Sequence, residues 1–392
     1  MLQATVLGKQ VYDITGRELD IGLLGLAEFL PAALLVLVTG SVADRFNRKI
    51  IGSIAIAGEL LCSVLLGLYA LSDPTAVWPL FVIAVLFGTF RAFAAPSVRS
   101  LPPMVAPDGA LPRTIALYSA TWTSAAIIGP ASGGLIYASS PALAYFVSAV
   151  LIGAGVAFLL AVKIARPFLK DQPKDPAEKV SLHTALAGLR FIRKTPILLA
   201  AISLDLFAVL FGGAVALLPA IAEDRLHVGD VAYGWLRAAP GIGAAIMAVL
   251  LASRPVTRKV GRTLLFVVGL FGIATVVLGV TTSYFVAFVA LVILAGADMI
   301  SVYIRGTLVP LVTPDDKRGR VMAVENVFIG ASNELGAFES GVAAQAFGTQ
   351  TAVIGGGIAT LGVVAMYSIF FPTLRNVDRF EDLEGHGDAI SQ

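Results

Sequence analysis

Eight ionisable side chains stand within long apolar stretches of the sequence, where a charge is costly. They are Glu28, Glu59, Asp205, Arg237, Asp298, Glu325, Glu334 and Glu339. A charged residue at the centre of a bilayer costs about 2.5–3.5 kcal/mol on insertion scales, so residues that persist there are candidates for function. A carboxyl in such surroundings can take up and release a proton in each cycle of a process. These residue types therefore favour proton or cation chemistry.

Two of the acids lie near the middle of their apolar stretches. Asp205 is about nine residues into the stretch 197–221, and Glu334 is about thirteen into 321–347. A rise of about 1.5 Å per residue brings both close to the bilayer midplane, where transporter sites lie. We expect one of them to couple protons, with a packing role as the alternative for each.

The remaining polar residues fall into two groups. Successive residues of a helix are about 100° apart, so Glu325, Asn326, Asn333 and Glu339 share one face, which we expect to line a cavity or the joint between two halves. Glu28 and Arg237 lie in the outer third of their stretches and could form a gate ion pair or reach the membrane interface. Asp298 is a further cavity or gate candidate, whereas Glu59 suits a packing role better.

The composition is that of a multi-pass membrane protein. The 392 residues are 57% hydrophobic and 14% charged, which leaves too little polar surface for a water-soluble protein of this size. A helix needs about 20 apolar residues to cross the hydrocarbon layer. We expect the opening residues 1–15 to be the second half of a first helix whose beginning lies upstream. Eleven full spans are predicted near 20–42, 50–71, 77–96, 114–137, 141–162, 197–221, 231–252, 264–281, 283–303, 321–347 and 350–371.

Positive charge gives the predicted orientation. Nearly all of the 28 Lys and Arg residues, Arg91 and Arg305 included, are assigned to alternate loops, which the positive-inside rule places in the cytoplasm. We expect an inner (plasma) membrane protein with a cytoplasmic C-terminus.

Residues 163–195 have linker composition, and apolar residues from Leu182 to Ile192 recur there at helical spacing, which indicates a short helix or a solvated linker. The predicted parts are an N-terminal helical half (1–162), a cytoplasmic linker (163–195), a C-terminal six-helix half (196–371) and a disordered cytoplasmic tail (372–392).

Several classes of function find no support. The sequence has no phosphate-binding Gly-x-x-x-x-Gly-Lys-Ser/Thr loop. Its basic residues lie in short loops without interleaved aromatics, which argues against nucleic-acid binding. The His residues are confined to predicted loops and the tail, and the lone Cys62 permits no internal disulfide. We therefore expect no enzyme activity, cofactor or metal site and no required oligomer; the expected partners are a small molecule, protons and the bilayer.

Three features of the chain carry a resemblance to a known family. The charged loop Gly40-Ser-Val-Ala-Asp44-Arg45-Phe-Asn-Arg48-Lys49 resembles the signature between the second and third helices of the major facilitator superfamily. The stretch Gly129-Pro130-Ala-Ser-Gly133-Gly134 resembles the antiporter signature of its exporters, with Ala125 where that signature has glycine.

Four residues, Pro103, Pro107, Asp108 and Arg113, recur 207 positions later as Pro310, Pro314, Asp315 and Arg320, which suggests a parallel internal repeat. A second copy of the charged loop, 254–262, lacks the acid.

The resemblance implies a fold and a function. The fold would be the all-α major facilitator fold of two six-helix halves. Segments Gly22–Pro31, Tyr233–Gly243 and Arg318–Gly341 look like the branch of the enterobactin exporter and the transmembrane secretion effectors. We expect a secondary transporter, proton-coupled and exporting a small amphipathic molecule such as a siderophore or drug. The alternatives are an importer of the same fold and a non-transporting sensor.

Overall fold

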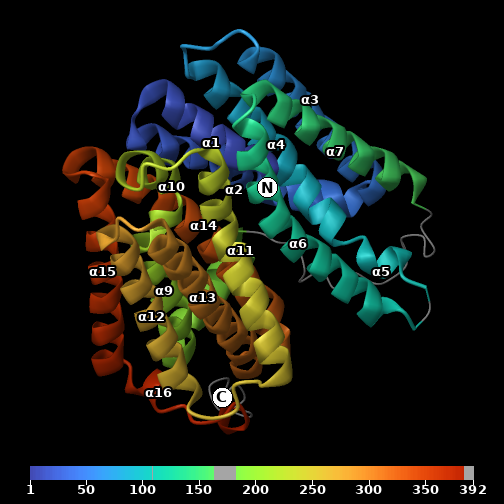
Figure 1. The fold of residues 1–392 in the computed structure, drawn as a ribbon. Coiled ribbons are helices and arrows are strands. Elements are labelled where there is room, and N and C mark those ends of the chain that lie inside the picture. The colour runs from blue at the N-terminus through green and yellow to red at the C-terminus, as the bar shows by residue number, and fades with distance from the viewer. Residues whose placement is uncertain (108, 163–181, 384–392) are drawn as a thin grey trace. The chain divides into compact units, whose positions relative to one another are not determined.

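The computed structural model describes residues 1–107, 109–162 and 182–383. Within these ranges the chain forms helices joined by short loops and contains no β-strand (Figure 1). Contacts divide it into two units, Met1–Lys179 with Gly229–Ala238, and Val180–Val228 with Ala239–Gln392. The all-helical fold expected from the sequence is confirmed.

In its described residues the first unit holds seven helices and the beginning of an eighth. Its α3 packs against α4 and α7, and α2 packs against α4. Apolar residues of α1, α3, α4, α6 and α7 share one buried core. The helices are α1 (Leu2–Thr15), α2 (Glu18–Arg45), α3 (Arg48–Ala70), α4 (Trp78–Arg99), α5 (Pro102–Val105), α6 (Leu111–Tyr137) and α7 (Pro141–Ala161), followed by the first turns of α11 (Asp230–Ser253).

The second unit has α12 between α13 and α15, with α9 against α14 and α15 (Figure 1). The short helix indicated within residues 182–192 is present as α8, and it packs against α14. The elements are α8 (Leu182–Lys194), α9 (Pro196–Phe211), η2 (Gly213–Val215), α10 (Leu218–Ala220), η3 (Ile221–Arg225), the rest of α11, α12 (Val260–Val280), α13 (Tyr284–Val312), α14 (Asp315–Phe347), α15 (Thr349–Phe370), α16 (Pro372–Arg375) and η4 (Glu381–Leu383).

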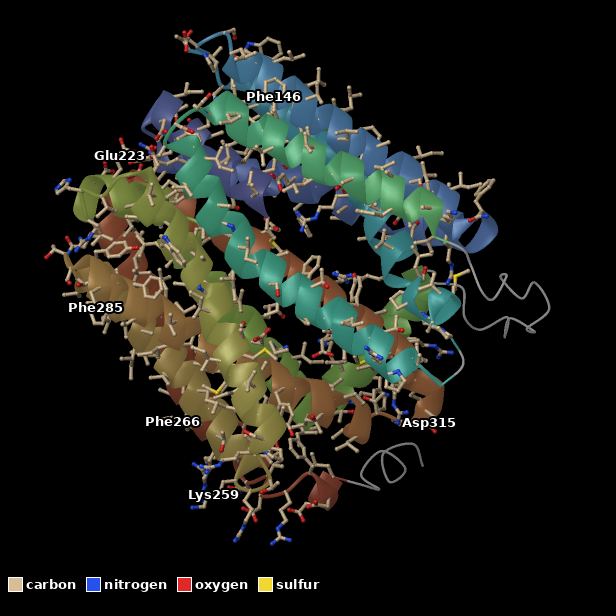
Figure 2. The ribbon with its side chains drawn as sticks, turned by 45° about the vertical axis from the view of Figure 1, so that its right-hand side comes forward. Phe146, Glu223, Lys259, Phe266, Phe285 and Asp315 are labelled. Atoms are coloured by element: carbon tan, nitrogen blue, oxygen red, sulfur yellow. The ribbon has the colours of Figure 1, made fainter. Side chains whose placement is uncertain are left out.

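Eight helical stretches of the described chain are long and apolar enough to cross a membrane. They are α3, α4, α7, the run from α9 to Arg225, α11, α12, α13 and α15. The long helices α2, α6 and α14 are not among them. Large apolar side chains cover the outer surface: Phe266 is 69% exposed and Phe285 72%, and both point away from the second unit (Figure 2). A surface of this kind suits lipid rather than water.

Two expectations from the sequence are wrong. Arg305 and Arg91 were assigned to cytoplasmic loops, but they lie inside α13 and α4. Arg305 is paired with two acids and Arg91 with one, and a paired charge does not force a helix to end. The tail after residue 371 was expected to be disordered, yet Leu374 and Leu383 are buried because they pack into the core of the second unit. Residues 384–392 and the linker residues 163–181 lie outside the described ranges.

Candidate functional site

A buried arginine pairs with two acids from different helices in the second unit. Arg305 of α13 is only 3% exposed, Asp205 of α9 is 6% exposed and Glu325 of α14 is 5% exposed. Arg305 Nη2 lies 2.7 Å from Asp205 Oδ1, and Nη1 lies 3.6 Å from Glu325 Oε1. Arg305 Nε donates to Ser301 Oγ at 3.4 Å. We call Asp205, Arg305 and Glu325 the buried triad.

Contacts with α15 hold α9, the helix that carries Asp205, in place. Pro196 begins α9, where a missing backbone donor has no cost. Tyr367 of α15 donates to Ser203 Oγ at 2.7 Å, and Thr360 donates to the carbonyl of Ala208 at 3.3 Å. These bonds fix α9 two residues before and three residues after Asp205. The acid is therefore carried by a firmly seated helix.

The triad has more negative than positive charge. Among the described residues, the ion pairs of Asp205 and Glu325 both go to Arg305. One guanidinium balances one carboxylate, so a triad with both acids ionised carries a surplus negative charge. Adding one proton makes the group neutral. Because an uncompensated buried charge is strongly destabilising, this arrangement suits binding and release of a single proton or another monovalent cation.

A small cavity of about 10 Å³ lies beside Asp205. Asp298 and Ser301 line it together with apolar residues of α9, α12 and α13. That volume is close to the space one water molecule occupies. The structure thus places Asp298 and Asp205 of the triad on the same small cavity.

The other acids and amides of α14 are placed differently. Glu334 is half-buried and stands nine residues beyond Glu325, roughly 13 Å along the helix. Glu339 is also half-buried. Asn326 and Asn333 are exposed, and their amides donate to the carbonyls of Met322 and Ile329 at 2.9 and 2.8 Å. The structure brings Glu325, but neither asparagine, to the triad.

The acid Glu28 of the first unit lies near an arginine of α4. Arg91 Nη1 is 3.9 Å from Glu28 Oε2. The gate pair expected from the sequence was Glu28 with Arg237, which lies in α11. Arg237 also interacts electrostatically with Glu28, so Glu28 lies within the electrostatic field of both arginines.

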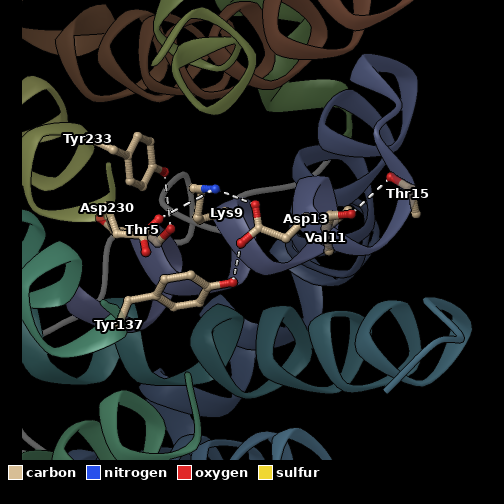
Figure 3. A network of polar contacts seen from close by, with 8 residues as sticks. All are labelled: Thr5, Lys9, Val11, Asp13, Thr15, Tyr137, Asp230 and Tyr233. Atoms are coloured by element: carbon tan, nitrogen blue, oxygen red, sulfur yellow. Dashed lines mark hydrogen bonds and ion pairs between the residues drawn. The ribbon is translucent and has the colours of Figure 1, made fainter. Parts of the chain in front are cut away.

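A second polar cluster surrounds Lys9 of α1 (Figure 3). Lys9 pairs with Asp13 and, at 3.5 Å, with Asp230 at the start of α11. Tyr137 of α6 donates to Asp13 Oδ2 at 2.5 Å, and Tyr233 donates to the carbonyl of Thr5 at 3.1 Å. Asp13 is one helical turn from Lys9, but Asp230, Tyr137 and Tyr233 are far from it in the chain, so only the folded structure brings the cluster together.

The charged loop is described only in part. The side chains of Gly40, Asp44 and Arg45 lie outside the description. Lys49 Nζ donates to the carbonyls of Leu160 and Val162, each at 2.8 Å, at the end of α7. A cation is favourable there because the last carbonyls of a helix lack intrahelical partners. Arg48 is half-buried at the first position of α3.

Close helix packing accounts for part of the Gly-Pro stretch of α6. A Cβ built on Gly134 would lie 2.5 Å from the Cα of Gly234 in α11, and one on Gly234 would lie 2.8 Å from the Cα of Gly134. Pro130 and Gly133 are buried on the same helix. The two backbones can approach this closely only when both positions lack a side chain.

Comparisons with known proteins agree on one family. The model of the transmembrane secretion effector family matches residues 3–387. An uncharacterized MFS-type transporter, YfiS of Bacillus subtilis, is 28% identical over 89% of this chain and 84% of its own. The multidrug efflux pump Tap of Mycolicibacterium fortuitum is 27% identical over 93% and 90%.

Solved structures show the same fold. The nucleoside transporter NupG superposes with a TM-score of 0.72 over 96% of this chain and 97% of its own, at 12% identity. A bacterial homologue of the lysosomal transporter Spinster, in an inward-facing conformation, gives a TM-score of 0.68 over 95% and 94%, at 15% identity. At such identities the likeness shows the fold alone.

Proposed function

We propose that this chain, which belongs to the transmembrane secretion effector family of MFS-type transporters, exports a small amphipathic molecule in exchange for protons. It is a multi-pass membrane transporter of a small molecule. Export is supported by two relatives, the multidrug efflux pump Tap and macrolide efflux protein A of Streptococcus pyogenes, the latter 26% identical over 45% of this chain. Drug-like compounds and siderophores are the proposed substrates, and the plasma membrane, with a cytoplasmic C-terminus, is the proposed location.

The buried triad is the observation that best supports proton coupling. With one guanidinium between two carboxylates, the protonated and deprotonated triads differ by one charge in a site almost closed to solvent. Such a group favours a different packing of α9, α13 and α14 in each state. A proton binding on one side of the membrane and leaving on the other would then bias the conformational cycle. Glu334 is the second coupling candidate.

The test is uptake into proteoliposomes with an imposed pH gradient. The panel contains a macrolide, a cationic dye and a catecholate siderophore, and each is measured in both gradient directions. The variants are Asp205→Asn, Glu325→Gln and Glu334→Gln, with Asn333→Ala as a control because that amide bonds only within its own helix among the described contacts.

We expect at least one panel compound to be concentrated by the gradient in the direction of export. Asp205→Asn should abolish that accumulation and keep energy-independent exchange, because it mimics the neutral triad while Arg305 retains Glu325 as a partner. Full accumulation in all three acid variants would refute Asp205, Glu325 and Glu334 as coupling sites. Accumulation only in the import direction would refute export.

A further inference from the structure

The C-terminal segment 372–383 folds back onto the loop that joins α11 to α12. Leu374, Val377 and Leu383 are buried in the core of the second unit. Phe380 meets Tyr303 of α13 edge to face, with ring centroids 6.5 Å apart. The segment is therefore anchored along its whole length by apolar contacts.

The same segment satisfies the first backbone donors of α12. The amides of Val260 and Gly261 donate to the carbonyls of Asp378 and Val377 at 3.2 and 3.1 Å. The amide of Lys259 donates to the carboxylate of Asp378 at 3.1 Å. The first amides of a helix have no intrahelical acceptor, and no side chain next to α12 in sequence caps it. Asp378 thus acts as the cap of α12 from more than a hundred residues away.

Asp378 also pairs with a basic residue of the α11–α12 loop. Its Oδ2 lies 3.6 Å from Arg258 Nε, and Lys259 projects from this loop in Figure 2. Negative charge at a helix N-terminus is favourable because the helix dipole is positive there. The approach of the segment is close: a Cβ on Gly261 would collide with the carbonyl of Leu374 and lie 3.2 Å from the carbonyl carbon of Arg375.

We propose that Asp378 supplies, from the C-terminal segment, the carboxylate that the α11–α12 loop lacks. Residues 254–262 repeat the basic pattern of the loop 40–49 but contain no acid. In the structure, a carboxylate from elsewhere in the chain stands at that loop. Asp378 is a positioning residue: it holds the loop and the start of α12 to the segment, and through Phe380 to α13, while the transporter changes conformation. The proposal requires a transporter but neither proton coupling nor a direction of transport.

A labelling experiment tests the contact without any substrate. Leu383→Cys is introduced with Cys62→Ser, which leaves one cysteine, and the rate of reaction with a soluble maleimide is compared with and without Asp378→Ala, which removes the side-chain acceptor of the Lys259 amide. Loss of the cap should raise that rate roughly fivefold, because removing a helix cap has about that effect on an equilibrium. Glu381→Ala is the matched control, since it truncates an exposed acid of the same segment. Equal labelling rates in all three proteins would overturn the proposal.

A transport experiment tests the role in the cycle. Asp378→Ala should lower the maximal transport rate several-fold and leave the apparent KM unchanged, because a positioning residue acts on the conformational change and does not bind the substrate. A chain ending after Leu383 should transport like the parent, whereas one ending after Phe371 should not. Parent rates in both Asp378→Ala and the chain ending after Phe371, at equal amounts in the membrane, would overturn a positioning role.

Discussion

Replacing Arg305 by methionine removes the only guanidinium paired with Asp205 and Glu325 among the described ion pairs. At 2.7 Å and an effective dielectric constant of about 20, its attraction to Asp205 is about 6 kcal/mol. Part of that is offset by the cost of burying both charges. Losing one partner of a buried pair costs about 3–5 kcal/mol, because the other charge stays buried and uncompensated.

Three variants of the triad separate charge balance from packing. Asp205→Asn alone should lower the stability of the folded protein only slightly, since Arg305 still pairs with Glu325. Arg305→Met alone should be the least stable. Adding Asp205→Asn to Arg305→Met should recover part of the loss, because it removes one of the two uncompensated carboxylates. The double variant should therefore be more stable than Arg305→Met.

The assay is thermal unfolding of purified protein in detergent, followed by loss of the monodisperse peak in size-exclusion chromatography. We expect Arg305→Met to lower the midpoint by about 10 °C, on the scale of a few degrees per kcal/mol for a unit of this size. Lowering the midpoint equally in Arg305→Met and in the double variant would show that the loss comes from packing. A parent-like midpoint in Arg305→Met would refute the ion-pair account.

Two further predictions concern helix packing and capping. Gly134→Ala should sharply reduce the folded yield because its Cβ has no space beside Gly234, whereas Gly155→Ala, with nothing within 4 Å of a Cβ, should be neutral; equal yields would contradict the close crossing. Lys49→Met should cost roughly 1–2 kcal/mol through loss of its bonds to the last carbonyls of α7, which a lower unfolding midpoint would show and an unchanged one would contradict.

The sequence by itself determined the class of fold. Apolar stretches of helical length predicted nearly every long helix, since a chain in hydrocarbon must satisfy its backbone hydrogen bonds within a helix. It also marked Asp205 and Glu325 as unusual, because charge in such stretches is rare. The sequence misplaced Arg305 because the positive-inside rule counts each charge without its partner. An unpaired arginine is unfavourable within a membrane span, so Arg305 was assigned to a loop.

Only the tertiary structure decided which residues meet. The members of the triad come from α9, α13 and α14. Positions 205, 305 and 325 have no spacing in the sequence that predicts their contact. The same holds for Asp378, which caps α12 although it belongs to a segment whose acidic composition predicts disorder. Periodicity reports local helix formation and the face that is apolar. The pairing of buried charges depends on which faces cross, and crossing is set by packing between segments far apart in the chain.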